Sequence, residues 1–156
     1  MQKYKVYINN NQRIIVSDWK SFCSKKLLIK AAGGLVYNRY NQILMIYRNN
    51  KWDLPKGKLE PTENIKECAI REVKEECGVG SLNITSKLSE TYHTYQLGKR
   101  NILKHTFWFR MYTDYNGELL PQLSEGITKV EWVNKRDITD KFDNIFLSIK
   151  ELLLDE

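Results

Sequence analysis

Acidic residues recur at short intervals in one stretch of the sequence, GKLEPTENIKECAIREVKEECGV, residues 57–79. Within it, Glu72, Glu75 and Glu76 stand at positions i, i+3 and i+4. On an α-helix these spacings put three carboxylates on one arc of roughly 100°, where like charges repel one another. A divalent cation would offset that repulsion, and Mg2+ and Mn2+ prefer carboxylate oxygen ligands. The alternative is a solvated charged face that neighbouring basic residues brace.

A helix must carry these glutamates. Pro61-Thr62-Glu63 has the composition of a helix start with Thr62 as the N-cap, and Gly78 is a suitable stop. Apolar residues at helical spacing lie beside the acidic arc and would dock the helix on a sheet, leaving the arc to face a cleft. These apolar residues are Ile65, Ala69, Val73 and Cys77.

Strands are expected on both sides of that helix, because apolar and β-branched runs separated by turn residues precede and follow it. A hairpin is expected at residues 3–17, and an amphipathic helix from about Asp140 to Leu154. Strands before and after each of two helices predict an α/β/α sandwich with a mixed β-sheet. The other expected strands span residues 27–38, 41–48, 82–97, 101–115 and 129–133.

Composition narrows the class of protein. The 156 residues, 42% of them hydrophobic and 28% charged, suit one compact globular domain. No apolar run reaches the length of a membrane helix and the N-terminus lacks a signal-peptide pattern, so a cytoplasmic protein without membrane contacts is expected. Cys23, Cys68 and Cys77 lack CxxC spacing and favour neither disulfides nor a zinc site. The net charge of +6 favours polyanionic partners, either phosphorylated metabolites or nucleic acid.

Gly57, Glu63 and the run from Arg71 to Val79 fit one longer pattern without departure: Gly, five residues, Glu, seven residues, Arg-Glu-apolar-any-Glu-Glu-any-Gly-apolar. This pattern resembles the Nudix box of the Nudix hydrolase family. The resemblance covers about residues 28–154, so we expect an N-terminal β-hairpin extension at residues 1–27 and a Nudix domain at residues 28–156. It implies the Nudix fold, an α/β/α sandwich, in agreement with the pattern of strands and helices.

The resemblance also implies roles for individual residues. Glu72, Glu75 and Glu76, with the main-chain carbonyl of Lys56, match the ligands of Mg2+ or Mn2+, and Glu72 and Glu76 are the expected catalytic glutamates. A bound cation would neutralise pyrophosphate oxygens and lower the pKa of a coordinated water. Glu125 precedes Gly126 in a loop where mutator-type nucleoside triphosphate pyrophosphohydrolases carry a metal-binding Glu. It is a candidate catalytic base or further ligand; the alternative is an ordinary turn residue.

Four box residues are expected to be structural. Gly57 would let the loop backbone pass close to the metal. Glu63 and Arg71 match the family's pair that braces the loop against the helix. Gly78 would end the helix.

Cations beside the box are candidates for phosphate binding. Lys56 and Lys58 flank Gly57, and Arg48 ends the preceding strand, so the three could contact non-bridging phosphate oxygens. For Lys58, an exposed solubilising side chain is an equal alternative.

Other residues bear on the identity of the substrate. The Trp-x-x-Pro-Lys-Gly run that begins at Trp52 resembles diadenosine tetraphosphate hydrolases and mRNA-decapping enzymes. Tyr95 lies sixteen residues after Val79, where dinucleoside polyphosphate hydrolases tend to carry tyrosine. Trp52 or Tyr95 could stack on a base. His93 and His105 could each touch phosphate or base, or could simply pack against their aromatic neighbours.

The favoured function is Mg2+- or Mn2+-dependent hydrolysis of a pyrophosphate bond in a nucleoside diphosphate linked to another moiety, with a dinucleoside polyphosphate as the favoured substrate. Alternatives are a nucleoside triphosphate pyrophosphohydrolase, an ADP-ribose pyrophosphatase, an RNA 5'-pyrophosphohydrolase and a nucleotide-sensing regulatory protein. Nucleic acid is not the favoured partner, because no RNA-binding module is evident. The oligomeric state stays open.

Overall fold

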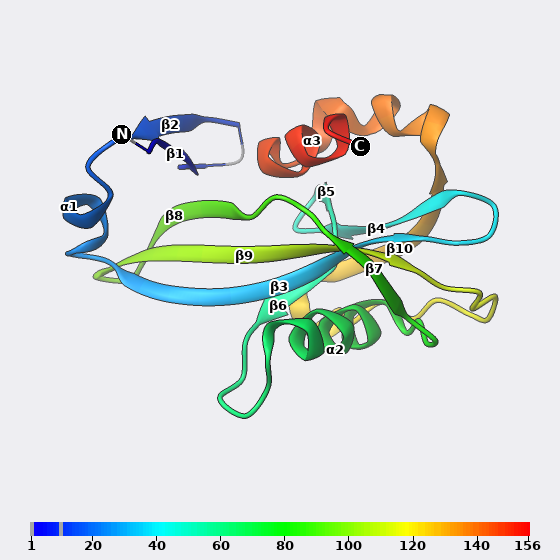
Figure 1. The fold of residues 1–156 in the computed structure, drawn as a ribbon. Helices are drawn as coiled ribbons and strands as arrows, with labels where there is room; N and C mark the ends of the chain where they lie inside the picture. The colour runs from blue at the N-terminus through cyan, green and yellow to red at the C-terminus, as the bar shows by residue number, and fades with distance from the viewer. Residues whose placement is uncertain (1, 10) are drawn as a thin grey trace.

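The computed structural model describes residues 2–9 and 11–156. A mixed β-sheet lies between two helical layers, with α2 on one face and α3 on the other (Figure 1). The expected α/β/α sandwich is therefore confirmed. In the described residues the strands are β1 (Tyr4–Tyr7), β2 (Arg13–Val16), β3 (Leu27–Tyr37), β4 (Gln42–Arg48), β5 (Lys51–Asp53), β6 (Lys56–Lys58), β7 (Asn83–Lys87), β8 (Thr91–Leu97), β9 (Arg100–Tyr112) and β10 (Ile127–Asn134).

The helices are fewer and mostly short. They are α1 (Trp19–Cys23), α2 (Ile65–Cys77), α3 (Leu147–Leu154) and the 3-10 helices η1 (Leu123–Glu125) and η2 (Lys135–Asn144). No helix of the described chain has both the length and the apolar character that a membrane crossing demands.

The main path of the sheet runs β10-β4-β3-β9-β8-β1-β2. Its centre is the parallel pair β3 and β9, aligned from Leu27 opposite Ile102 to Tyr37 opposite Tyr112. β8 continues the sheet antiparallel to β9. β5 and β6 branch from β4 and β3, so the loop between them emerges from the middle of the sheet.

Each face of the sheet has its own core. The core below α2 includes Ala69, Val73 and Cys77 from the helix, as its apolar spacing predicts, packed against Val36 and Phe109. The core under η2 and α3 is formed by Leu35, Met45, Trp52, Trp108, Ile138, Ile145, Ile149 and Leu152, among others. Helix α2 is thus fixed to one face of the sheet, and the C-terminal helices to the other.

The ends of α2 were only half predicted. The N-cap is Asn64 and not Thr62: the Asn64 side chain accepts from the Glu67 amide at 2.9 Å, while the Glu67 carboxylate accepts from the Asn64 amide at 3.0 Å. This reciprocal capping box satisfies two free amides, which Thr62 lies too early to do. Gly78 ends the helix as predicted, with φ +73°.

Two other boundaries differ from prediction. The expected strand 82–97 is two strands, β7 and β8, because the pairing with β9 shifts by one residue between Lys87, opposite Phe109, and Thr91, opposite Thr106. The expected helix 140–154 is interrupted: Ile145 is extended, with φ −137° and ψ 150°, and forms a bridge with Trp52. The regular helix therefore begins only at Leu147. Helix α1 was not predicted.

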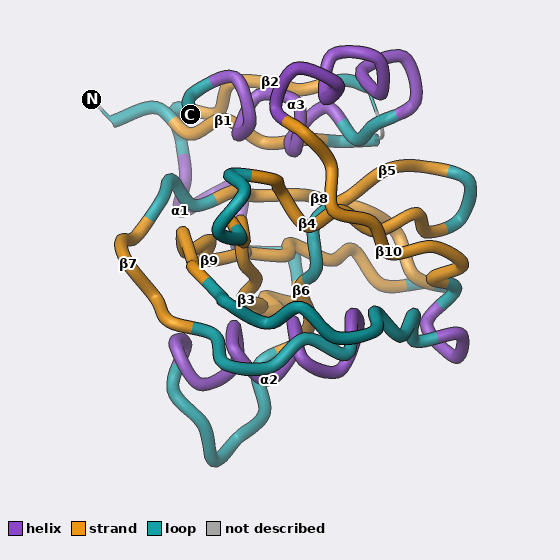
Figure 2. The backbone as a smooth tube through the Cα atoms, turned by 90° about the vertical axis from the view of Figure 1, so that its right-hand side faces the viewer, coloured by secondary structure: helices purple, strands orange, loops and turns teal. Residues whose placement is uncertain are grey.

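The N-terminal hairpin extends the sheet. β1 pairs antiparallel with β2 and parallel with β8, placing Val6 opposite Tyr92 and Tyr7 opposite His93. Figure 2 shows the hairpin and α3 along the same side of the sheet. In the structure, β1 shares a sheet with β8. The division of the chain into an extension at residues 1–27 and a domain at residues 28–156 therefore stays a prediction from the sequence.

Candidate active site

Glu76 is the most buried of the box glutamates. It is 2% exposed, and its Oε1 accepts a hydrogen bond from the Lys56 amide at 3.0 Å. Burial raises the pKa of the Glu76 carboxyl to about 7, against the opposing effect of the nearby Lys56 charge. Its negative charge is thus poorly compensated by the surrounding protein.

Glu72 lies against the loop that precedes the helix. A Cβ atom added to Gly57 would fall 2.0 Å from Glu72 Cδ, so a residue with a side chain here would displace the carboxylate. Burial raises the pKa of Glu72; Arg71 opposes that rise, and the charges of Glu75 and Glu125 add to it. Gly57 therefore leaves room for the Glu72 carboxylate, and the charge of Glu125, at the end of η1, acts on the same carboxylate.

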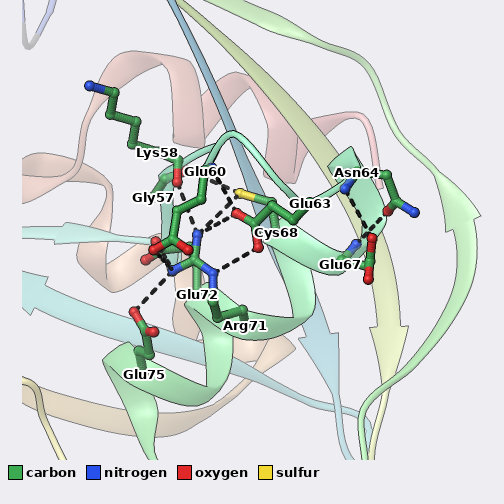
Figure 3. Close-up of polar contacts among 10 residues, drawn as sticks. All are labelled: Gly57, Lys58, Glu60, Glu63, Asn64, Glu67, Cys68, Arg71, Glu72 and Glu75. Atoms are coloured by element: carbon green, nitrogen blue, oxygen red, sulfur yellow. Dashed lines mark hydrogen bonds and ion pairs between the residues drawn. The ribbon is translucent and has the colours of Figure 1, made fainter.

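Arg71 ties the loop to the helix (Figure 3). Its Nε donates to Glu63 Oε2 at 2.8 Å and its Nη2 donates to Glu63 Oε1 at 2.5 Å and to the Lys58 carbonyl at 3.0 Å. Hydrogen bonds from Arg71 lower the pKa of the Glu63 carboxyl to about 2. These contacts give Glu63 and Arg71 a geometry suited to the predicted bracing.

Two of the three glutamates on the acidic arc share one basic partner, Arg71. Arg71 Nη1 donates to Glu72 at 2.7 Å and to Glu75 at 3.2 Å, drawing both carboxylates toward the guanidinium. Across residues 2–9 and 11–156, no three His, Cys, Asp or Glu side chains are gathered as a ready cation site.

The residues nevertheless fit a hard divalent cation. Glu72, Glu75 and Glu76 offer only oxygen donors from one helix, as Mg2+ and Mn2+ prefer. The Glu72 carboxylate, which occupies the position that a Cβ at Gly57 would take, and the poorly compensated charge of Glu76 both suit such an ion. The Lys56 carbonyl stays a predicted ligand.

A cavity of about 230 Å³ lies on the opposite face of the sheet, between β8, β9 and the start of α3. Lys56 joins it to the glutamates, because its amide contacts Glu76 while its side chain enters the cavity. The lining residues are Arg48, Asp53, Lys56, Thr91, His93, Tyr95, Lys104, Thr106, Trp108, Phe146 and Ser148.

Positive charge exceeds negative charge in this cavity. Asp53, 1% exposed, accepts from Arg48 Nη2 at 3.1 Å and from Lys56 Nζ at 2.5 Å. Lys104 adds a third cation. Burial, together with Lys56 and Arg48, lowers the pKa of Lys104 to about 8, and burial also lowers the pKa of Lys56.

Two further groups complete the chemistry of the cavity. Burial and the charges of Lys56 and Lys104 lower the pKa of His93 to about 4, so its imidazole is neutral near pH 7. Arg48 Nε is buried and, within the described part of the chain, has no hydrogen-bond partner. A donor left without a partner among excess cations suits an anionic ligand.

The structure brings some predicted substrate contacts together and separates others. Arg48, Lys56, His93 and Tyr95 line the one cavity. Lys58 is exposed, and its side chain points away from Arg71 and the glutamates that Arg71 contacts (Figure 3).

Trp52 is not placed to stack on a base, contrary to expectation. It is only 9% exposed, packs into the core below α3, and carries Lys141 Nζ 3.9 Å from its ring centre. His105 also lies outside the cavity, on the other face of β9, where it stacks on Tyr92 and bonds to Glu90. Side chains of successive strand residues point to opposite faces of the sheet, so His105 faces away from the cavity that Lys104 lines.

Asp53 and Lys104 were missed by the sequence analysis. Asp53 follows Trp52 in the sequence, and nothing near it in the sequence indicates that two cations share its carboxylate. Lys104 could have been found from the strand pair, since the register sets it directly opposite His93.

Comparison with known proteins gives a family match. The sequence model of the NUDIX domain matches residues 27–153. Over 125 residues the chain is 27% identical to mRNA-decapping enzyme subunit 2 of Saccharomyces cerevisiae (strain YJM789), a match that covers 77% of this chain and 12% of that protein. The chain thus spans only a small part of that curated relative's length.

Solved structures show the same fold. The MutT protein from Methanosarcina mazei Go1 superimposes with a TM-score of 0.63 at 22% identity, covering 84% of this chain and 94% of that one. An Ap4A hydrolase binary complex from C. elegans gives a TM-score of 0.60 at 22% identity, covering 80% and 92%.

Proposed function

Because this chain belongs to the Nudix family, we propose that it is a pyrophosphohydrolase that uses Mg2+ or Mn2+ to cleave a pyrophosphate bond in a nucleoside diphosphate linked to another moiety. The main observation behind this proposal is that Lys56 contacts both Glu76 and the cavity. Its amide holds the buried Glu76, and its ammonium group lies in a cavity with excess positive charge. An anionic substrate in that cavity would therefore contact the same lysine that holds Glu76 of the acidic helix.

In this proposal the glutamates of α2 hold the cation. Glu72, Glu75 and Glu76 are the ligands, and the Lys56 carbonyl completes the set from β6. When bound, the cation would neutralise pyrophosphate oxygens and lower the pKa of a coordinated water. Glu125 is proposed as a further ligand or as the base that accepts a proton from that water.

The cations of the cavity have a different task. Arg48, Lys56 and Lys104 would bind the non-bridging oxygens of the phosphate chain, and the buried Asp53 would hold the first two in place. His93, being neutral, would serve as a hydrogen-bond partner rather than a fourth charge. Their role is to bind and orient the phosphate chain.

A dinucleoside polyphosphate is the substrate we propose. Three cations around one carboxylate favour a chain of several phosphates, since each additional phosphate gains charge-assisted hydrogen bonds. At about 230 Å³ the cavity is smaller than the roughly 300 Å³ or more that encloses a whole drug-sized ligand. Part of a dinucleoside ligand would therefore stay outside it. Tyr95, at the lining, is proposed to stack on a base.

The test is a comparison of kcat/KM for diadenosine tetraphosphate, ADP-ribose, a nucleoside triphosphate and 5'-triphosphate RNA, with Mg2+ and with Mn2+. We expect diadenosine tetraphosphate to be cleaved with a higher kcat/KM than ADP-ribose, which offers two phosphates only. A preference for ADP-ribose or for a nucleoside triphosphate would refute the dinucleoside substrate and leave the hydrolase. Binding of all four without hydrolysis would favour a regulatory protein.

A 5'-pyrophosphohydrolase of RNA is the second candidate. Two observations favour it: the 27% identity to a yeast mRNA-decapping subunit and the net charge of +6. Its end product would be a 5'-monophosphate RNA. Faster turnover of 5'-triphosphate RNA than of diadenosine tetraphosphate, at equal salt and metal, would decide for this candidate.

A further inference from the structure

The N-terminal hairpin contacts two walls of the cationic cavity, although residues 2–16 precede the stretch that matches the NUDIX domain. One wall is β8, which contributes Thr91, His93 and Tyr95. The other is the start of α3, which contributes Phe146 and Ser148. The hairpin is joined to both.

β1 holds the first wall through the sheet. It pairs in parallel with β8 and sets Tyr7 directly opposite His93. Paired residues of neighbouring strands share a face, so the Tyr7 side chain lies on the cavity side of the sheet next to a residue of the lining. Tyr7 is 5% exposed and does not itself line the cavity.

The same tyrosine holds the second wall. Its hydroxyl donates to Glu151 Oε1 in α3 at 2.9 Å, and Lys5 and Arg13 place cations 3.5 and 3.6 Å from that carboxylate. Glu151 stands one helical turn after Ser148, so the contact is made beside the part of α3 that closes the cavity. Burial and Glu151 raise the pKa of Tyr7, which keeps the phenol a donor over the working pH range.

Helix α3 depends on such contacts for its position. It has eight residues, and its N-cap, Phe146, makes no side-chain capping bond. Isolated helices of this length are unstable in water, so tertiary contacts determine where α3 lies. The bond to Glu151 is one such contact, and it connects α3 to the strand that carries His93.

We propose that Tyr7 and Glu151 are positioning residues for substrate selection: through them the N-terminal hairpin sets the separation between β8 and α3, and hence the fit of the phosphate chain. This rests on the proposed function, which assigns the cavity to the substrate's phosphates. Neither residue touches the substrate. Their loss should therefore weaken binding and leave the chemical step unchanged.

The test compares wild type, Tyr7→Phe and Glu151→Ala, with Tyr4→Phe as the matched control. Tyr4 lies on the same strand, but its ring stacks on Trp19, away from Glu151. For diadenosine tetraphosphate, Tyr7→Phe should raise KM by roughly tenfold with kcat within about twofold of wild type, since a hydrogen bond to a charged group is lost. The effect of the double variant should be less than additive. Tyr4→Phe should match wild type.

Two measurements need no turnover. Calorimetry with inorganic tripolyphosphate, in the absence of divalent metal, should show roughly tenfold weaker binding by Tyr7→Phe. Amide exchange of Ile149 and Lys150, which both donate to the Phe146 carbonyl, should be faster in Tyr7→Phe than in Tyr4→Phe.

The outcomes separate this inference from the proposed function. Unchanged tripolyphosphate affinity and unchanged exchange in Tyr7→Phe would overturn the positioning role, as would a fall in kcat with KM constant. A wild-type protein that binds tripolyphosphate tightly but hydrolyses no nucleotide would refute the proposed function alone. A wild type that hydrolyses nucleotides but binds no tripolyphosphate would overturn the positioning role and the assignment of the cavity to phosphates, and would leave the hydrolase.

Discussion

Glu76 shows how one residue can be both structural and chemical. Its carboxylate is buried, it accepts from the Lys56 amide at the start of β6, and it is a proposed cation ligand. Glutamine at this position could still accept that hydrogen bond but would bring no charge to the cation. The structural and chemical contributions can therefore be separated by a single substitution.

We predict that Glu76→Gln lowers kcat by at least about a hundredfold, because lost charge at a cation site costs several kcal/mol of transition-state stabilisation. Far-UV and near-UV circular dichroism should match wild type. Glu67→Gln is the control, since it lies on the same helix and glutamine also serves in a capping box. Near-wild-type turnover of Glu76→Gln at saturating Mg2+ would remove Glu76 from the catalytic set.

Lys104 gives the cavity a charge that depends on pH. The groups facing it are Lys56, Arg48, Asp53 and the neutral His93, and its pKa is lowered to about 8. Below pH 8 Lys104 is mostly protonated and adds to the positive charge. As pH rises through 8 that charge is lost, so the affinity for an anion should fall.

The corresponding measurement is tripolyphosphate affinity between pH 7 and 9, with wild type compared with Lys104→Arg and Lys104→Met. Ionisation of the ligand itself affects all three proteins alike. Wild type should lose affinity relative to Lys104→Arg, whose guanidinium stays charged. Lys104→Met should bind weakly throughout. Parallel curves for wild type and Lys104→Arg would mean that Lys104 does not titrate in this range.

At the scale of elements, α2 and the loop before it behave as one unit because Arg71 bonds both. The guanidinium reaches Glu63, Glu72 and the Lys58 carbonyl. Loss of Arg71 would leave the half-buried carboxylates of Glu63 and Glu72 without their partner.

We therefore predict that Arg71→Ala lowers both activity and the melting temperature, the latter by roughly 4–8 °C for a loss of about 2 kcal/mol. Glu63 has its pKa lowered to about 2, so its stabilising contribution is complete above the unfolded value near 4.5 and is lost as pH falls toward 2. The difference in melting temperature between wild type and Arg71→Ala should therefore narrow as pH falls from about 4.5 toward 2. Lys74→Ala, exposed on the same helix, is the control. Equal melting temperatures for Arg71→Ala and wild type would argue against bracing.

The sequence predicted α2 well because its information is local. Helical spacing alone identified the acidic arc and the buried face, and Gly78 ended the helix as expected. The capping box was present in the sequence, as Asn64 and Glu67 three residues apart, but Thr62 looked equally suitable without the structure.

The cavity was predicted only in part because its lining comes from six strands and helices. Arg48, Lys56, His93 and Tyr95 were named one at a time, but nothing local showed that they share a cavity with Lys104 and Asp53. Trp52 looked suited to stacking because its sequence neighbours resemble a motif. Its burial follows from a bridge with Ile145, more than ninety residues later. Such pairings are set by tertiary packing.

For the molecule as a whole, the sheet separates two charge environments. The acidic helix α2 covers one face of the sheet and α3 covers the other (Figure 1). The cationic cavity lies on the α3 face, and Lys56 contacts both Glu76 of α2 and the cavity. Around these sites the chain carries 25 basic and 19 acidic residues, giving a net charge of +6. A polyanion would thus be attracted first by the whole surface and then by the cavity.

This attraction leads to a prediction about ionic strength. Long-range steering is screened beyond about 10 Å at 0.1 M salt, and its strength scales with the charge of the ligand. As the salt concentration rises from about 20 to about 200 mM, the kcat/KM for diadenosine tetraphosphate should therefore fall more steeply than the kcat/KM for ADP-ribose. Lys104→Met should reduce that slope, whereas an exposed change remote from the cavity, Lys66→Met, should reduce it less. Equal slopes for the two nucleotides would show that charge does not govern how this protein captures its substrate.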